Sequence, residues 1–587
     1  MSGVLRYVPI VEWLGRYRRD DLRGDVAAGL TTAVILVPQG MAYAMLAGLP
    51  PIVGLYASVI PPLLYAVFGT SRQLSVGPVA MDSLMVASAV GAVAAQGSSQ
   101  YIAMAIVLGA MVGIIQLLMG LLRLGVLVNL LSRPVVSGFT SAAALIIGFS
   151  QLKHLLGIDI ARSRYIHRIA MEALVRIDET HGLTLILGLL AIGLLIGLKR
   201  RWPRVPGALI VVVMSTMACA LLGLEARGVS VVGAVPAGFP MPSIPIIDTA
   251  MMRTLLPSAM VIALIGFVES VSVANTFAAK NRYAIDANQE LIALGAANLG
   301  GAVFQGYPVA GGFSRSAVHA QAGARTPLAL IVTAVVVAIA LIYLTPLFYF
   351  LPKAALAAVI LTAVIKLIDV THVQYLWRVK RDDLALLVLT FVTTLTVGIG
   401  LGLTVGVGAS LLWVLVKTVR PHVAVLGHLP GTTSYRNVRH YPEATPIPGV
   451  VILRMDAPFY FANVSFLKMQ IASLRHRMAA RVVILDCSGI NELDSSAGEA
   501  LHALLDDLRS RDVDLYLANV KGPMAKVLAR SRFIGAIGAD RVVLTVHHAV
   551  QQLRADGRIE GPSVDLHVPS PYPNSRVSFD PRAQLSP

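Results

Sequence analysis

Repeated long apolar segments are the feature that most limits what this chain can fold into. Between residues 26 and 417 the sequence returns to apolar runs of about 20 residues, the length that an α-helix needs to cross a bilayer. Only 14% of the 587 residues are charged, whereas soluble domains carry about a quarter. The chain is therefore predicted to be a mostly α-helical, polytopic membrane protein.

The apolar runs predict about 14 membrane segments, counting those that cross only part of the bilayer. Twelve runs lie near 26–47, 52–69, 101–124, 131–152, 182–198, 206–224, 254–276, 285–304, 327–345, 350–368, 383–398 and 400–417. Two shorter runs, near 79–94 and 313–323, complete the set.

Basic residues predict how these segments are oriented. If the N-terminus is cytoplasmic, the loops after even-numbered segments are cytoplasmic too, and most basic loop residues fall there, as the positive-inside rule requires. Lys353 is an exception. Leaving out either short segment would reverse the orientation of everything downstream. The net charge of +16 is explained in this way, so nucleic-acid binding is not expected.

The two short segments carry matching interruptions. Ser75–Ala87 reads SVGPVAMDSLMVA and Gly306–Val318 reads GYPVAGGFSRSAV, so both contain Pro-Val-Ala followed by a serine, Ser83 or Ser314. Matched Gly/Pro interruptions in two halves of a membrane protein point to a substrate site. A helix that starts in mid-membrane has unpaired N–H groups and a positive dipole end, which favour an anion. The alternative is that the prolines and glycines only kink ordinary spans.

Three ionisable residues lie in or near these interruptions. Arg315 is a full charge inside a predicted span, and with the serine hydroxyls it suits an oxyanion. Glu269 lies in the apolar run MVIALIGFVESVSVANTF, where a carboxylate must be protonated, paired or ion-bound, so it is a candidate for proton or sodium coupling. Asp82 is a weaker candidate, because an acid at a helix start also stabilises the helix. The alternatives for Arg315 are a position at the membrane interface or a permanent pair with Glu269.

The first span supplies two further candidates. Pro38 is expected to break the helix there, and Gln39 and Tyr43 follow it. They are four residues apart and so lie on one helix face. Either side chain could line a cavity or form hydrogen bonds between helices.

The character of the chain changes after Pro421. Apolar strand-like runs at Val450–Met455, Val482–Asp486, Val513–Ala518 and Val542–Leu544 alternate with helical patterns at Ser465–Arg477 and Ser496–Arg509. Such alternation predicts a small cytosolic α/β domain. The predicted regions are a cytosolic segment at 1–24, a transmembrane domain at 25–420, a linker at 421–446, the α/β domain at 447–556 and a disordered tail at 557–587.

Enzymatic chemistry is not expected. The sequence shows no nucleotide loop, no cluster of metal ligands and no nucleophile–base arrangement, so no catalytic or metal-binding residues and no cofactor are predicted. Cys219 and Cys487 lie far apart and imply neither a disulfide framework nor a metal site.

Three motifs give the chain a family resemblance. They are LVPQGMAYAMLAGLPP (Leu36–Pro51), PIVGLYASVIPPLLYAVFGTSR (Pro51–Arg72) and GGFSRSAVHAQAGARTP (Gly311–Pro327). With them the chain resembles the sulfate permease (SulP) family of anion transporters, from about Asp21 to Leu553. Val53 stands where the family signature favours tyrosine.

The resemblance implies a uracil-transporter-like inverted repeat of seven plus seven segments, with a core domain that moves against a gate domain, and a homodimer. Segments 3 and 10, the two interrupted stretches, would meet at the substrate site. Glu269 matches the family's acidic position in segment 8, whereas Asp82 has no counterpart, which leaves the substrate and the coupling stoichiometry open. The substrate-binding residues predicted in this way are Gln39, Tyr43, Val79, Ala80, Ser83, Phe313, Ser314 and Arg315.

The C-terminal domain resembles a STAS domain through DCSGINELDSSAGEALHALL (Asp486–Leu505). In relatives that regulate sigma factors a serine in this turn is phosphorylated, and Ser495 and Ser496 fall there. A phosphate at a helix N-terminus would be electrostatically favourable. The alternative is that the two serines cap the helix. The resemblance implies dimer contact, trafficking or gating as the role of the domain, with a cytosolic regulator as a partner.

The function expected from the sequence is secondary active transport of a small anion across a bacterial inner membrane, with both termini cytoplasmic. Sulfate is the first candidate substrate and a proton the first candidate coupling ion. Dicarboxylate or bicarbonate transport, with proton or sodium coupling, is the alternative. An uncoupled anion channel or exchanger, and a receptor that reports anion occupancy through its STAS domain, are the other possibilities.

Overall fold

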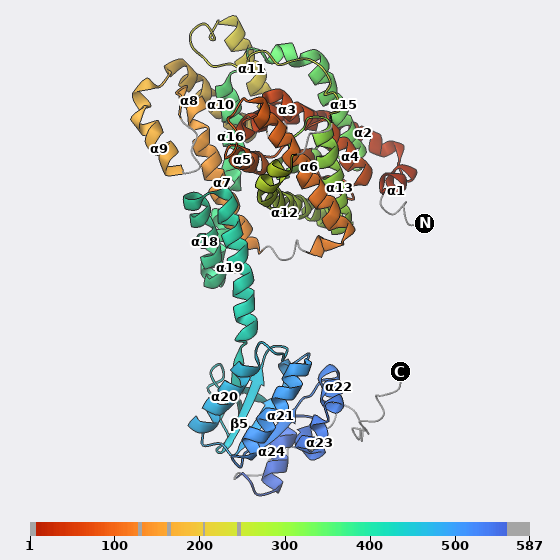
Figure 1. Ribbon diagram of the computed structural model, residues 1–587, viewed down its shortest axis with the longest axis vertical. Coiled ribbons are helices and arrows are strands. Elements are labelled where there is room, and N and C mark those ends of the chain that lie inside the picture. Colours follow the sequence, from red (N-terminus) through yellow and green to blue (C-terminus); the bar gives the residue numbers. More distant parts are fainter. Residues whose placement is uncertain (1–7, 127–131, 161–165, 203–205, 244–247, 560–587) are drawn as a thin grey trace. The chain divides into compact units, whose positions relative to one another are not determined.

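A computed structural model of the chain (Figure 1) describes residues 8–126, 132–160, 166–202, 206–243 and 248–559. It divides into two compact units, Met1–Ser410 and Leu411–Pro587. The first seven residues of the predicted N-terminal segment lie outside the described residues, as does nearly all of the predicted disordered tail, from residue 560 onward.

The first unit is helical. Its elements are α1 (Ile10–Gly15), α2 (Arg19–Ala47), α3 (Pro51–Tyr56), α4 (Ile60–Phe68), β1 (Val76–Gly77), α5 (Ala80–Val90), α6 (Ser99–Leu121), α7 (Arg133–Ser150), α8 (Leu152–Leu156), α9 (Ile166–Val175), α10 (Gly182–Arg201), α11 (Gly207–Leu221), α12 (Thr249–Lys280), α13 (Ala287–Val303), β2 (Ala310–Gly311), α14 (Phe313–Gln321), α15 (Leu328–Ile339), α16 (Lys353–Val364), α17 (Val370–Val379), α18 (Arg381–Val397) and the start of α19 (Ile399–Val419).

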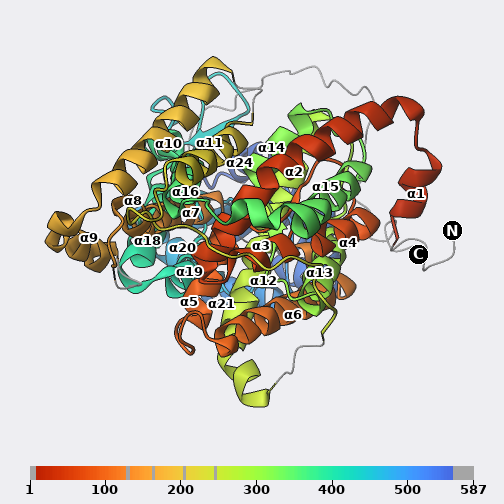
Figure 2. The same ribbon diagram turned by 90° about the horizontal axis from the view of Figure 1, so that it is seen from above.

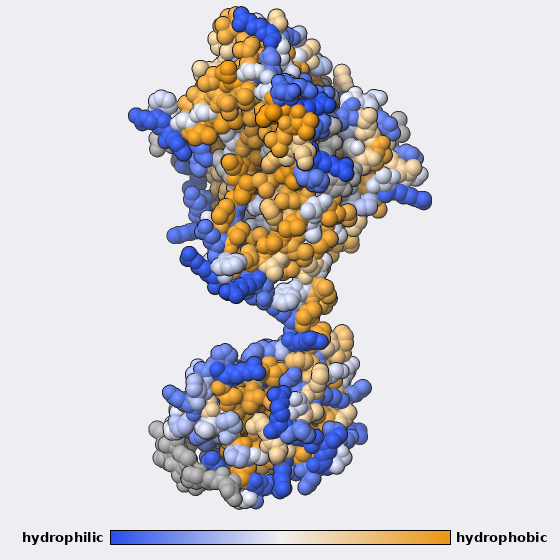
Figure 3. Space-filling view, turned by 90° about the vertical axis from the view of Figure 1, so that its left-hand side faces the viewer, coloured by the Kyte–Doolittle hydropathy of each residue, from blue (hydrophilic) through white to orange (hydrophobic). Residues whose placement is uncertain are grey.

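These helices confirm the predicted membrane segments. In the described part of the chain, eight helical stretches are long and apolar enough to cross a membrane, and α5, α11 and α16 are shorter apolar helices. The helices α13, α14 and α18 occupy the remaining predicted segments. Apolar residues cover much of the face of this unit that Figure 3 presents, as expected of a surface in contact with lipid.

The helix α2 corrects one expectation. Pro38 was expected to break this span, but α2 continues through it for 29 residues and ends at Gly48, which adopts the left-handed conformation with φ 83°. Proline is tolerated inside a buried membrane helix because neighbouring segments compensate for the lost hydrogen bond. Gln39 and Tyr43 therefore lie on an unbroken helix.

The packing of the helices separates the first unit into two sets. The core group comprises α2 to α6 and α12 to α15, where the main contacts are α6 with α13, α2 with α15 and α4 with α13. The gate group comprises α7, α8, α10, α11 and α16 to α18, where α7 packs on α18 and α10 on α16. The two groups meet where α2 contacts α11 and α16 and α5 contacts α7 (Figure 2). This arrangement agrees with the predicted core and gate domains.

One fully buried carboxylate holds the loop that leads into β1. Glu290, in the first turn of α13, accepts hydrogen bonds from the Tyr65 hydroxyl (2.6 Å), the Thr70 hydroxyl (2.6 Å) and the backbone N–H groups of Thr70 (2.8 Å) and Ser71 (3.1 Å). Four donors to one carboxylate offset the cost of burying its charge. The sequence analysis did not single out Glu290.

A second buried carboxylate holds the loop that follows α14. Asp25 of α2 accepts from the backbone N–H groups of Arg325 (2.8 Å) and Thr326 (3.0 Å) and from the Thr326 hydroxyl (2.6 Å). Asp25 and Glu290 are both completely buried. Together they fix one end of each interrupted segment to a neighbouring helix.

The second unit is an α/β domain. Its six-stranded sheet has the order β4-β3-β5-β6-β7-β8, with β5 to β8 parallel and β3 antiparallel to both β4 and β5. The elements are β3 (Val423–His428), β4 (Tyr435–Asn437), β5 (Val450–Met455), α20 (Val464–Arg477), β6 (Val482–Asp486), α21 (Ser495–Arg509), β7 (Asp514–Ala518), α22 (Gly522–Arg530), α23 (Phe533–Ile537), β8 (Val542–Val543) and α24 (Val546–Ala555).

Alternation along the strands builds a core on each face of this sheet. In β5, Val451 and Leu453 point into the cluster with α20 and α21, whereas Val450 and Ile452 point into the cluster with α24. The strands and helices predicted from 450 to 544 are confirmed. The region 421–446, predicted as a linker, instead contains β3 and β4. Its Pro, Gly and Tyr content obscured β3, which lies between β4 and β5, and the three-residue edge strand β4.

We expect Glu290→Gln to lower the thermal unfolding midpoint of the purified protein in detergent. An amide has one acceptor oxygen and turns an N–H group toward four donors, so we expect a loss of about 1.5–3 kcal/mol for each charged hydrogen bond that fails. Glu12→Gln is the control, because Glu12 is exposed and, among the described residues, its one ion pair is with Arg16. Equal unfolding midpoints for the two variants would show that Glu290 does not hold the loop.

Candidate functional site

The two interrupted segments meet in the core group. β1 and β2 pair antiparallel, with Val76 opposite Gly311 and Gly77 opposite Ala310. Each strand leads within two residues into a helix, β1 into α5 and β2 into α14. The segments are therefore strand–helix breaks and not kinked spans, and because the strands are antiparallel the two helices begin at opposite ends of the pair.

Both helices begin without a side-chain cap. Val79 and Gly312 occupy the N-cap positions, and neither provides a capping hydrogen bond. Within the described residues, the backbone N–H groups of the first three positions of each helix have no acceptor; they belong to Ala80, Met81, Asp82, Phe313, Ser314 and Arg315. Unpaired N–H groups at two neighbouring helix N-termini are suited to binding an anion.

Arg315 ties the two segments together. Its guanidinium donates to the Ser75 hydroxyl (3.0 Å), the Ser75 carbonyl (3.1 Å) and the Pro78 carbonyl (2.8 Å), and the residue is 3% exposed. It interacts electrostatically with Glu269 but forms no ion pair with it in the described part of the chain. The structure therefore contradicts both alternatives for Arg315, which were a position at the membrane interface and a permanent ion pair with Glu269. The positive charge of Arg315 is held by neutral acceptors.

Glycines make room for this cation. A Cβ atom added to Gly77 or to Gly312 would lie 3.3 Å from an Arg315 guanidinium nitrogen. Gly77 also has φ 154°, which side chains rarely adopt. The Gly/Pro content that marked these segments therefore reflects close packing of the backbone around Arg315.

Of the other predicted residues in these segments, Val79 and Ala80 are buried at the start of α5. The Ser83 hydroxyl is already engaged: it donates to the Val79 carbonyl (2.7 Å) and lies 2.9 Å from the hydroxyl of Tyr307. Ser314 is exposed at the start of α14. Phe313, beside it, is 54% exposed and lies 6.4 Å from the Phe277 ring, centroid to centroid. The structure therefore brings these residues to the paired helix starts but leaves only the Ser314 hydroxyl open to a ligand.

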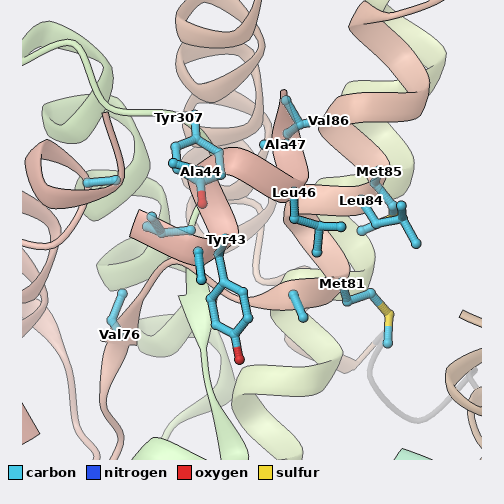
Figure 4. Packing of buried hydrophobic residues seen from close by; sticks show 14 of the residues in the cluster. Tyr43, Ala44, Leu46, Ala47, Val76, Met81, Leu84, Met85, Val86 and Tyr307 are labelled. Carbon is cyan, nitrogen blue, oxygen red and sulfur yellow. The ribbon is translucent and has the colours of Figure 1, made fainter. Parts of the chain in front are cut away.

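Gln39 and Tyr43 come to the same region from α2, which packs against α5 and α14. Both residues are buried, and neither side chain has a hydrogen-bond partner among the described residues. Figure 4 shows the Tyr43 ring between Val76 of β1 and Met81 of α5. Two buried polar side chains without partners are available to a ligand.

The two candidate coupling carboxylates also lack partners. Asp82 is 1% exposed and neither of its carboxylate oxygens has a hydrogen-bond partner among the described residues, nor does Oε2 of Glu269. A Cβ atom on Gly266 would lie 3.4 Å from Asp82 Oδ2. Gly266 precedes Glu269 by three residues on α12, so both face the same side. The two carboxyl groups are close enough to interact electrostatically.

Several polar residues that the sequence analysis missed complete the irregular backbone. Ser270 accepts from the Gly311 N–H (2.8 Å), and Ser316 accepts from the Ser75 N–H (2.8 Å). Asn298 of α13 bonds both the N–H (2.8 Å) and the carbonyl (3.0 Å) of Val309. A polar residue within an apolar span was the available signal for each of them. They satisfy backbone groups that have no water to bind at this depth.

His319 is a further residue that was missed. It lies one turn after Arg315 on α14, it is completely buried, and its Nδ1 atom is 2.8 Å from the Thr32 hydroxyl of α2. Its Nε2 atom has no partner among the described residues.

In the second unit, Ser495 and Ser496 are exposed at the first two positions of α21. The helix is capped by Asp494, whose Oδ1 accepts from the Ala497 N–H (2.7 Å) and whose Oδ2 accepts from the Phe461 N–H (3.0 Å). The alternative in which the serines cap the helix is therefore wrong. In the described part of the chain no group of three His, Cys, Asp or Glu residues could hold a metal ion.

Known proteins resemble this chain along nearly its whole length. It is 41% identical over 564 residues to "Sulfate transporter 4.1, chloroplastic" of Arabidopsis thaliana, covering 92% of this chain and 82% of that protein. It is 36% identical over 550 residues to "Probable sulfate transporter Rv1739c" of Mycobacterium tuberculosis, covering 93% and 98%.

Solved structures share the architecture. The murine anion transporter Slc26a9 in its inward-facing state matches with a TM-score of 0.86 and 27% identity, over 94% of each chain. The transmembrane domain of the cyanobacterial bicarbonate transporter BicA matches with a TM-score of 0.58 and 23% identity, over 67% of this chain and 98% of that one, and supports the fold alone.

Family models agree with these likenesses. Residues 22–390 match the model of the sulfate permease family, and residues 441–549 match that of the STAS domain. The chain with the paired helix starts around Arg315 is a member of the sulfate permease family and carries a C-terminal STAS domain.

Proposed function

We propose that this protein is a secondary active transporter of a small anion, with sulfate as the first candidate substrate. The observation that carries the proposal is the pair of uncapped helix starts around Arg315, which forms no ion pair in the described part of the chain. Relatives of 36% and 41% identity are named sulfate transporters, and a structural neighbour of 27% identity is an anion transporter. Dicarboxylate or bicarbonate remains the alternative substrate, because the same N–H groups and cation would serve either.

The anion accepts hydrogen bonds from donor groups that have no acceptor among the described residues. The N–H groups at the starts of α5 and α14 bind its oxygens, Gln39, Tyr43 and Ser314 add side-chain donors, and Arg315 supplies the positive field. Arg315 acts mainly through its charge, because three of its N–H groups already bind Ser75 and Pro78. Uptake proceeds by alternating access, with the core group moving against the gate group.

Two carboxyl groups give the site a simple charge balance. When empty, the site carries Arg315 and the ionised Asp82 and Glu269, which is a net charge of minus one. With sulfate bound and both carboxyl groups protonated, the net charge is again minus one. The buried region then carries the same net charge loaded and empty, so a complete transport cycle moves no net charge across the membrane. We therefore propose transport of one sulfate with two protons.

The remaining assignments follow the basic loops. The protein lies in a bacterial inner membrane with both termini cytoplasmic, and it forms a homodimer. The STAS domain contacts the second copy or a cytosolic regulator, and the exposed Ser495 and Ser496 are the candidate phosphorylation sites. The positions of the basic loops support the proposed orientation, and the match to the STAS domain supports the proposed role of the second unit.

Arg315→Gln should abolish sulfate binding, because the neutral side chain removes the charge that draws a dianion to the site. Arg315→Lys keeps the positive charge but loses some of the hydrogen bonds to Ser75 and Pro78, so we expect weaker but measurable sulfate binding. Binding is measured by isothermal titration calorimetry on protein that elutes as a single species. Wild-type affinity in folded Arg315→Gln protein would rule out Arg315 as the source of the field.

Accumulation in proteoliposomes tests the two-proton proposal. With the membrane potential held at zero, a gradient of one pH unit should drive about 100-fold sulfate accumulation for two coupled protons and about ten-fold for one. Asp82→Asn and Glu269→Gln should each give about ten-fold accumulation and make transport sensitive to membrane potential. The double variant should lose accumulation and keep sulfate–sulfate exchange. Wild-type accumulation by Asp82→Asn would show that Asp82 carries no transported proton.

A further inference from the structure

A cavity of about 490 Å³ lies in the first unit beside the candidate anion site. Its walls come from α2 and α5 of the core group and from α7, α8 and α16 of the gate group. Ala42 and Leu84, which line it, are the chain neighbours of Tyr43 and Ser83. The cavity thus lies where the two helix groups meet, and its wall includes α2 and α5, the helices that carry Tyr43 and Ser83.

The far end of the cavity belongs to one side of the membrane. It is lined by Gln96, in the turn between α5 and α6, by Asp159, in the chain after α8, and by Lys353, the first residue of α16. In the orientation proposed above, all three of these places lie on the outer side. The cavity therefore lies on the path from the outside to the paired helix starts.

Basic side chains dominate the charge of this cavity. Lys153, His154 and Lys353 line it, against one acidic residue, Asp159. Lys353 is the informative one, because a lysine on the outer side departs from the positive-inside rule. Its side chain has no ion pair and no hydrogen bond among the described residues. Its charge also lies at the N-terminal end of α16, where the helix dipole has the same sign.

We propose that this cavity is an outer binding vestibule for small oxyanions such as sulfate, in which Lys353 attracts the anion before it reaches the paired helix starts. Apolar residues on the wall, among them Leu46, Leu84, Ala357 and Ile360, have a low dielectric response and concentrate the field of the lysine in the cavity. The assignment of sulfate rests on the proposed function, whereas the attraction of anions by Lys353 does not.

Charged thiol reagents measure the potential in the cavity without any transport. In a background with Cys219→Ser and Cys487→Ser, which replaces the two buried free cysteines, Ala87→Cys places a reporter on the cavity wall. Intact inverted or right-side-out vesicles are treated with an anionic sulfonatoethyl or a cationic trimethylammonium-ethyl methanethiosulfonate. The ratio of the two labelling rates reports the local potential. Met241→Cys, an exposed residue outside the cavity, is the control reporter.

We expect the reporter in the cavity to react only from the outer side, and faster with the anionic reagent. Lys353→Gln should lower the anionic-to-cationic rate ratio by roughly five-fold at low ionic strength, as one charge at about 8 Å in water predicts. Lys353→Arg should preserve the ratio, high salt should abolish the effect, and Met241→Cys should not respond. In transport, Lys353→Gln should raise the KM for sulfate several-fold and leave kcat unchanged.

Two results would overturn the vestibule. One is labelling of Ala87→Cys from the cytoplasmic side alone, and the other is a rate ratio that Lys353→Gln does not change. If the ratio falls as expected but the wild-type protein moves no sulfate, the vestibule stands and the proposed substrate fails. If sulfate moves with an unchanged KM in Lys353→Gln and the ratio is also unchanged, the proposed function stands and the vestibule fails.

Discussion

The structure depends on satisfying irregular backbone inside a membrane. Two helices begin in the middle of the first unit, and the chain before each is extended. No lipid can bind the backbone groups exposed there, so the protein must. β1 and β2 pair with each other, Ser270, Ser316 and Asn298 bind the adjacent groups, and Arg315 takes two carbonyls. The N–H groups that remain unpaired are those that a bound anion can use.

The same constraint explains why Arg315 is fixed so firmly. A guanidinium that moved toward each anion would leave the Ser75 and Pro78 carbonyls without donors whenever an anion was bound. Held in place, it stabilises the strand pair in both states and still contributes its charge to the ligand. Both carboxylate oxygens of Asp82 and Oε2 of Glu269 have no such network among the described residues, which is why these two groups are the proposed proton carriers.

The sequence predicted the parts of this architecture that follow from hydropathy and alternation. The membrane segments, the α/β fold of the second unit and the charge of Arg315 inside the short segment near 313–323 could all be inferred in this way. What could not be inferred are the partners. The bond between Ser83 and Tyr307 joins residues 224 positions apart, Glu290 binds a loop 220 positions away at Thr70, and Asp25 binds a loop 300 positions away at Arg325. Local signals also favoured the two serines as the cap of α21, although Asp494, directly before them, occupies the N-cap position and accepts from the N–H group of Ala497.

The buried carboxylates and the position of the vestibule together indicate that the candidate site belongs to the core group and Lys353 to the gate group. Glu290 and Asp25 fasten the ends of both interrupted segments to helices of the core group, so the candidate site is bound to that group as one body. The cavity wall that carries Lys353 belongs to the gate group. If the core group moves against the gate group, the distance between the candidate site and Lys353 increases as the site turns away from the outer side. A lysine that attracts the anion on arrival would then exert less hold on it at release, which is what a carrier needs from a charge outside its binding site.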